Sequence, residues 1–162
     1  MQWLYGFRWI ELHDEVYYKL NGNVATGDYE YNNRLYGGQV GADVALSQSS
    51  SPLQFNIVGK GGLYGNVVDG GIYEFQGNNF IGSFVGDDVT SAFVGELNFN
   101  GTYYLSRSVS LTGGYSLLWL NNVALGSEAS SRSLLNPSLL RTVNDHNTLF
   151  YNGATAAINF VY

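Results

Sequence analysis

Apolar and polar residues alternate at every second position along most of this chain, which is typical of β-strands with one apolar and one polar face. Six long stretches carry the pattern, at about 3–20, 34–47, 53–67, 91–105, 109–120 and 148–162. The alternation shifts near Ile10 and Glu11, which predicts a β-bulge there. Helical periodicity is nearly absent, so we predict an all-β fold of antiparallel strands in up-and-down order.

The connections between these stretches alternate in length. Residues 48–52 and 106–108 form short links, whereas 21–33, 69–90 and 121–147 are long and rich in Gly, Asn, Asp and Ser. Outer-membrane barrels have short periplasmic turns and long extracellular loops. We therefore predict one domain, residues 1–162, that forms a transmembrane β-barrel with both chain ends on the periplasmic side.

Aromatic residues gather at both ends of the predicted spans, where amphipathic rings favour the headgroup level. One interface would hold Trp3, Tyr5, Phe55, Tyr103, Phe160 and Tyr162, and the other Tyr36, Phe93, Trp119 and Phe150. The predicted strand directions depend on the turn lengths alone. The positions of the two aromatic girdles are therefore semi-independent support for the barrel.

The third and fourth strands allow a register to be predicted. Pairing residues whose numbers sum to 156 closes a hairpin at 77–79, a sequence suited to a turn. It places Lys60 opposite Glu96 on the polar face and Leu63 opposite Phe93 on the apolar face. Both strands would then extend past the membrane as a two-stranded projection.

The composition fits a protein with a lipid-covered surface. Charged residues make up 12% of the chain, about half the roughly 25% usual in soluble domains, and 15% are aromatic. The net charge of -6, with no cluster of Lys and Arg, argues against a nucleic-acid partner. The absence of Cys excludes disulfides and thiolate metal sites.

No stretch reaches the ~18 apolar residues of a transmembrane helix. The first twelve residues lack the basic start and continuous apolar run of a secretion signal. For an exported protein, we expect that the signal has been removed or that the chain is a fragment.

Polar residues on the face opposite the apolar one would line the lumen. This set is Arg8, Gln39, Asp43, Gln54, Asn56, Lys60, Glu96, Asn98 and Asn100. It could tune the passage of solutes, or it could be a hydrogen-bonded plug that fills a narrow barrel. An eight-stranded barrel is just filled by its side chains and open channels need about 16 strands, so six strands conduct only if further strands widen the barrel.

Catalytic signatures are weak. His13, Asp14 and Glu15 form a dense ionisable cluster, but adjacent residues on a strand point to opposite faces, so we expect a solvated strand end. The G-x-S-x-G, H-E-x-x-H and Walker motifs are missing. We expect no enzyme activity, no cofactor and no metal.

The last eight residues resemble the terminal signal strand of outer-membrane barrels. That pattern ends in two aromatics separated by one residue, here Phe160 and Tyr162. Ala157 stands where the pattern usually has Gly. The resemblance implies recognition by the barrel-assembly machinery.

Three further segments carry a resemblance: Gly6-Phe7-Arg8-Trp9 followed by Glu11-Leu12, the stretch from Leu35 to Ala42, and the stretch from Gly114 to Leu125. They are similar to the beta-barrel porin-7 family of planctomycete-type bacteria. The resemblance spans most of the chain. Because members of that family are generally longer, it implies that N-terminal strands are missing here.

We therefore expect a bacterial outer-membrane barrel, in contact with membrane lipid, that serves passive, porin-like passage of small solutes or envelope structure. One alternative is a small non-conducting barrel that binds or anchors through its extracellular loops. Another is a soluble lipocalin-like barrel, which would need its apolar face inward. The sequence leaves open whether copies associate as a homo-oligomer.

Overall fold

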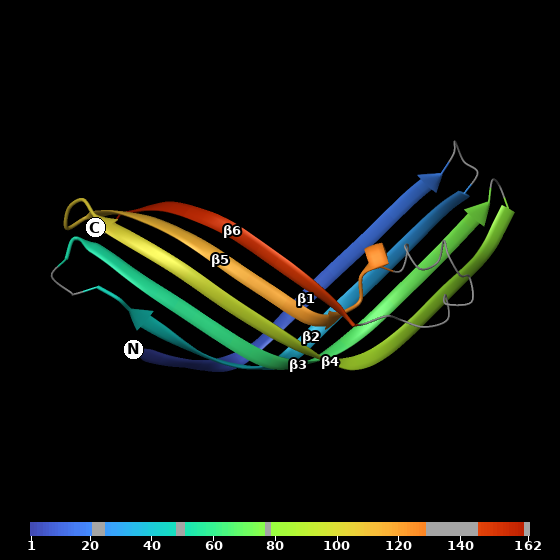
Figure 1. Cartoon of the computed structure of the whole chain (residues 1–162), viewed down its shortest axis with the longest axis horizontal. Helices are drawn as coiled ribbons and strands as arrows, with labels where there is room; N and C mark the ends of the chain where they lie inside the picture. Colours follow the sequence, from blue (N-terminus) through green and yellow to red (C-terminus); the bar gives the residue numbers. More distant parts are fainter. Residues whose placement is uncertain (21–24, 48–50, 77–78, 129–145, 161–162) are drawn as a thin grey trace.

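A computed structural model describes residues 1–20, 25–47, 51–76, 79–128 and 146–160. These residues form six strands: β1 (Gln2–Leu20), β2 (Ala25–Ala45), β3 (Leu53–Gln76), β4 (Asn79–Tyr104), β5 (Val109–Val123) and β6 (Asn147–Phe160). Each strand pairs antiparallel with the next in a single sheet of order β1-β2-β3-β4-β5-β6 (Figure 1). The sheet is an open half-barrel, which confirms the all-β, up-and-down prediction.

The sheet bends midway along its strands and so has two arms (Figure 1). β4 pairs with β5 only from Phe93 to Tyr104, so all six strands share one arm and only β1 to β4 continue into the other. We call these the six-strand arm and the four-strand arm. The N-terminus and Phe160, the last described residue, lie at the end of the six-strand arm away from the bend.

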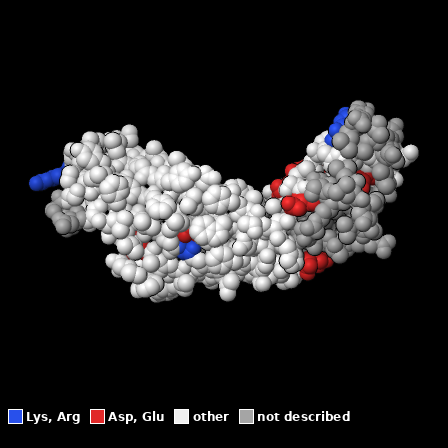
Figure 2. Space-filling model, viewed as in Figure 1, with Lys and Arg blue, Asp and Glu red and all other residues white. Residues whose placement is uncertain are grey.

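The polarity of the two sheet faces inverts at the bend. In the six-strand arm, the outer face exposes apolar residues such as Phe7 (74% exposed), while Arg8 lies on the inner face. In the four-strand arm, Glu11 and Glu15 occupy the outer face and Leu12 faces inward. Figure 2 shows the same division, with carboxylates gathered over the four-strand arm.

This inversion corrects the prediction of a bulge near Ile10 and Glu11. β1 and β2 pair without interruption from Gln2↔Asp43 to Leu20↔Ala25. The backbone therefore keeps its period of two, and only the chemistry of the two faces exchanges. A polarity change along a regular strand looks like a bulge in the sequence because both shift the apolar positions by one.

The predictions of long connections at 21–33 and 69–90 are also wrong, because β2 begins at Ala25, β3 continues to Gln76 and β4 begins at Asn79. Tyr29 and Tyr31 are buried on the inner face, and Asp28 and Glu30 alternate with them on the outer face. The polar outer residues made a regular strand resemble a loop.

The predicted register of β3 and β4 is confirmed from Leu53↔Tyr103 to Glu74↔Gly82, including Lys60 opposite Glu96. The projection beyond the bend has four strands rather than two, since β1 and β2 accompany β3 and β4. The predicted turn at 77–79 falls largely on residues 77–78, outside the described residues.

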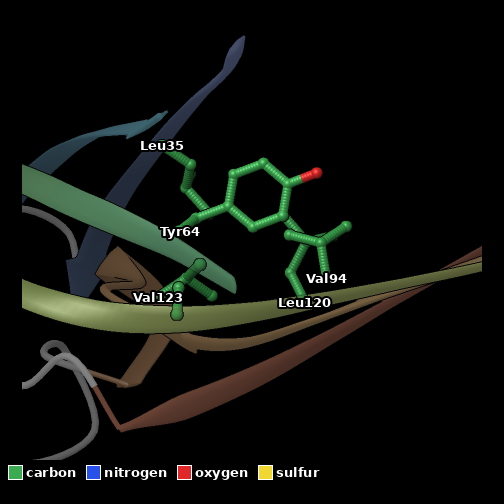
Figure 3. Packing of buried hydrophobic residues seen from close by; sticks show 6 residues of the cluster. Leu35, Tyr64, Val94, Leu120 and Val123 are labelled. Atoms are coloured by element: carbon green, nitrogen blue, oxygen red, sulfur yellow. The ribbon is translucent and has the colours of Figure 1, made fainter. Parts of the chain in front are cut away.

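Apolar side chains converge on the inner face at the bend. Leu35, Tyr64, Val94, Leu120 and Val123 come from β2, β3, β4 and β5 and are nearly fully buried (Figure 3). A second cluster continues along the four-strand arm, where Val68 and Ile72 pack with Tyr29 and Tyr31. Burial raises the pKa of the Tyr31 phenol above its ordinary value, so this hydroxyl stays neutral near pH 7.

The end of β5 and the segment after it fold back over this apolar face. Residues 122–128 are called the strap below. Asn122 has a φ of 61°, a left-handed conformation that Asn tolerates, and it turns the chain onto the inner face. Ala124 is fully buried in the second cluster. The Asp14 carboxylate accepts a hydrogen bond from the Gly126 N–H at 2.7 Å.

Two buried amides anchor the strap to the sheet. Asn33 donates from Nδ2 to the Ala124 carbonyl at 2.8 Å and accepts from the Ala124 N–H at 2.7 Å. Asn66 donates to Asn33 Oδ1 at 3.1 Å and to the Asn122 carbonyl at 3.1 Å. Because Asn33 and Asn66 are fully buried, their polar groups depend on these partners.

We predict that Asn33→Ala destabilises the protein by about 2–4 kcal/mol, because it leaves both backbone groups of Ala124 buried without their partner. Asn32→Ala, on the outer face of the same strand, should change stability by less than about 0.5 kcal/mol. The measurement is urea unfolding followed by circular dichroism. Equal midpoints for the two variants would contradict the role of Asn33.

Candidate functional site

The nine residues predicted to line a lumen share one surface. Arg8, Gln39, Asp43, Gln54, Asn56, Lys60, Glu96, Asn98 and Asn100 all lie on the inner face of the six-strand arm, and each is partly buried. They come from β1, β2, β3 and β4. Strict alternation in four paired strands places them together, so the sequence was sufficient to find them.

Glu96 is the centre of this surface. Its Oε2 accepts a hydrogen bond from Arg8 Nη1 at 2.5 Å, and its Oε1 accepts from Lys60 Nζ at 3.0 Å. Asn98 Nδ2 donates to the same Oε1 at 2.7 Å. The network joins β1, β3 and β4 across β2. The Arg8, Lys60 and Glu96 side chains are 32%, 27% and 17% exposed, so solvent reaches all three.

The rest of the lining is mostly uncharged. Asn56 donates to Asp43 at 3.2 Å, and the Tyr64 hydroxyl donates to Gln39 at 3.3 Å. Two cations, Arg8 and Lys60, face two anions, Asp43 and Glu96, among the predicted lining residues. The surface thus offers balanced charge with many hydrogen-bond donors and acceptors.

The sequence interpretation missed polar members of the same face on β4, β5 and β6. Thr102 and Thr112 lie opposite each other, with their hydroxyl oxygens 3.1 Å apart. Asn159 donates to the Thr112 hydroxyl at 2.9 Å and to Ser110 at 3.4 Å. Their parity within each strand was the signal that could have identified them.

The girdle residues all lie on the outer face of the six-strand arm: Trp3, Tyr5, Tyr36, Phe55, Phe93, Tyr103, Trp119 and Phe150. Trp9 joins them, and its ring stacks on that of Tyr36 with centroids 6.2 Å apart. Trp119 lies over Gly95, where a Cβ would come within 2.2 Å of the indole. Only glycine leaves room there for the ring.

The aromatic row nearest the bend consists of Trp9, Tyr36, Phe93, Trp119 and Phe150, and it runs obliquely across the strands. It steps down by two residues between β2 and β4, because Tyr36 is level with Gly65 in β3 and with Ser91 rather than Phe93 in β4. It steps down by two more between β4 and β5, where Asn121 rather than Trp119 lies opposite Phe93. The drop is roughly 13 Å over about 24 Å of sheet, a slope of about 30°. If this row lies parallel to a flat membrane surface, the strands must therefore be tilted from the membrane normal by about that angle.

The apolar outer band has a consistent height. It covers Leu53–Leu63 in β3, Phe93–Tyr103 in β4, Val109–Trp119 in β5 and Phe150–Phe160 in β6. Each run is about 33 Å long at about 3.3 Å per residue. Tilted by roughly 30–40°, it is about 25–29 Å tall, which compares with the ~25 Å band of membrane barrels.

The His13, Asp14 and Glu15 cluster is divided between the two faces, as expected. His13 lies on the outer face, with Nδ1 2.7 Å from Asn32 Oδ1 and 3.9 Å from the Glu30 carboxylate, and with Nε2 4.0 Å from the Glu15 carboxylate. Asp14 points inward to the strap. Within the described ranges, no grouping of three or more His, Asp or Glu could hold a metal ion.

Of the two terminal aromatics, Phe160 is exposed at the end of β6, and Tyr162 lies outside the described residues. In the part of the chain that the structure describes, no helix has the length and apolar character needed to cross a membrane.

Comparisons with family models, with curated proteins and with solved structures find no match for this chain. Any inference about its function therefore rests on the geometry of the two sheet faces.

We predict that Glu96→Gln destabilises the protein by about 1–3 kcal/mol, because Arg8 and Lys60 then share a partly buried site without their anion. Removing one cation as well, in Lys60→Gln with Glu96→Gln, should recover part of the loss. Glu11→Gln on the exposed outer face serves as the matched control. Urea midpoints give the coupling energy, and strict additivity of the two substitutions would contradict the network.

Proposed function

We propose that this chain forms part of the wall of a transmembrane β-barrel in a bacterial outer membrane, with its inner face lining a passage for small solutes. The observation that carries the proposal is the inversion of polarity along continuous strands. The six-strand arm is apolar outside and polar inside, whereas the four-strand arm has the reverse arrangement.

Each arm suits a different solvent. A strand in water exposes its polar side and buries its apolar side, as the four-strand arm does. A strand of a membrane barrel that encloses water exposes its apolar side to lipid and turns its polar side to the lumen. The oblique aromatic row marks the change between the two, at the level where Trp9 gives way to Glu11. The four-strand arm would then stand in the aqueous phase.

The proposal requires further strands. In the described sheet, β1 and β6 are edge strands without an outer partner. An open strand edge is not tolerated in hydrocarbon, and bacterial single-chain barrels have at least eight strands. β1 and β6 run antiparallel, so an even number of added strands closes the barrel. They come from another segment of a longer chain or from a second copy.

The strap favours a second candidate function, a barrel that does not conduct and that acts through its extracellular loops. The strap covers the inner face at and beyond the bend and so occupies space that a passage would use. Single-channel conductance and liposome swelling with the complete barrel distinguish the two functions. Conductance supports passage, and its absence supports the plugged barrel.

Matched valine substitutions test which solvent covers each arm. Val40 and Val89 are 67% and 71% exposed on the outer face, one in each arm. In lipid vesicles, Val40→Lys should cost about 2–4 kcal/mol, because it places a charge in the hydrocarbon. Val89→Lys should stay within about 0.5 kcal/mol. A neutral Val40→Lys would refute the membrane assignment.

Refolding tests the same proposal directly. With detergent micelles, the complete barrel should gain β-structure by circular dichroism and show a gel mobility that changes on boiling. Without micelles it should gain neither. Stable β-structure in plain buffer would instead favour a soluble barrel that binds an apolar ligand.

A further inference from the structure

An apolar groove of about 620 Å³ lies on the outer face of the six-strand arm, at the end away from the bend. Its walls are aromatic and aliphatic side chains from β3, β4 and β5, among them Phe55, Phe99, Tyr103, Leu111 and Tyr115. Its volume is within the range of small-molecule sites. The groove is thus a local hollow in the outer band.

Two glycines form the floor of the groove. Gly101 and Gly113 lie directly opposite each other in β4 and β5. A Cβ at Gly101 would lie 3.0 Å from the Phe55 ring, so this ring leans over the glycine. A Cβ at Gly113 would meet nothing within 4 Å and would project into open space. A side chain at 113 would therefore fill the groove without disturbing the sheet.

A short polar turn, Ser106 to Ser108, lies beyond the end of the groove that is away from the bend. Tyr103 and Leu111 form the last groove-lining pair before the β4–β5 turn, and Arg107 lies at the tip of that turn. The turn is held by hydrogen bonds from Leu105 and Ser106 to the Val109 carbonyl, at 3.0 and 3.1 Å. The exposed Arg107 is thus about 10 Å beyond the groove, counted along the strands.

The ligand that matches this arrangement has an apolar tail and an anionic head. Side chains of the apolar band line the groove, so an acyl chain can lie in it. The guanidinium of Arg107 favours a phosphate at the headgroup level. The phenol of Tyr103 lies between the two, as is usual for tyrosine at a membrane interface.

We propose that this groove binds one acyl chain of an anionic phospholipid whose phosphate meets Arg107. The inference rests on the membrane assignment made above. It assigns Gly113 as the residue that keeps the site open and Arg107 as the residue that selects the charge of the headgroup.

The experiment titrates the complete barrel in neutral detergent micelles with phosphatidylglycerol and counts bound lipids by native mass spectrometry. Gly113→Leu fills the groove and should weaken binding at least tenfold, and Gly113→Ala should give an intermediate loss. Gly38→Leu is the matched control, because Gly38 is an outer-face glycine outside the groove where a Cβ also meets nothing within 4 Å. It should bind like the parent protein.

Arg107→Gln should weaken binding of phosphatidylglycerol about fivefold and leave binding of phosphatidylcholine unchanged. The boiling-dependent gel shift confirms that each variant has folded. Equal binding by Gly113→Leu and Gly38→Leu would overturn the site, since the lipid would then only coat the barrel.

A dimer that the Gly113→Leu variant abolishes would also overturn the proposal, because a second copy would then occupy the groove. Folding in micelles without selective lipid binding rejects the groove alone. Failure to fold in micelles, together with folding in buffer, rejects the membrane assignment as well.

Discussion

Strands that stay continuous while their two faces exchange polarity impose the main constraint on this structure. The backbone keeps a strict period of two through the bend, so each face must exchange its chemistry near the bend in β1, β2, β3 and β4. A one-residue slip between any two of these strands would place apolar residues on the wrong face in both arms at once. Two separate apolar surfaces therefore constrain the strand register: the outer band of the six-strand arm and the inner core of the four-strand arm. The long uninterrupted pairing between neighbouring strands follows from this double requirement.

The polar side chains inside each arm differ in kind, according to how much water reaches them. In the six-strand arm, charges are tolerated because Glu96 lies between Arg8 and Lys60 and solvent reaches all three. At the bend, the two fully buried side chains that hold the strap, Asn33 and Asn66, are neutral amides, whereas the Asp14 carboxylate that bonds Gly126 is only partly buried. An amide can both donate to and accept from one peptide unit, as Asn33 does with Ala124. A carboxylate at position 33 would be buried without a cation and could not donate to the carbonyl.

Much of the sheet could be predicted from the sequence because alternation and paired character are local properties. The β3–β4 register followed from matching Lys60 with Glu96 and Leu63 with Phe93, and the nine lining residues followed from parity alone. The errors came from treating apolar outward as the only strand pattern. That assumption made Asp28 to Asn32 look like a loop and Ile10 to Glu11 look like a bulge. The strap could not be predicted, since Asn33 and Ala124 are 91 residues apart and neither carries a local signal for the other.

The strap and the Glu96 network together limit what a passage along the inner face could be. The strap is anchored by Asn33 and Asn66 on β2 and β3 and packs against Leu35, Tyr64 and Leu120, so it narrows the space beside this half of the wall at the bend. Farther from the bend, in the six-strand arm, the Glu96 network spreads over β1, β3 and β4 without the strap. In the proposed barrel, added strands would therefore have to supply the free width opposite the strap, while charge on the described side is already balanced. A solute on this path would meet hydrogen-bonding groups with little net charge before it reached the narrowest level. The width of the passage, rather than its charge, would therefore decide which solutes are excluded.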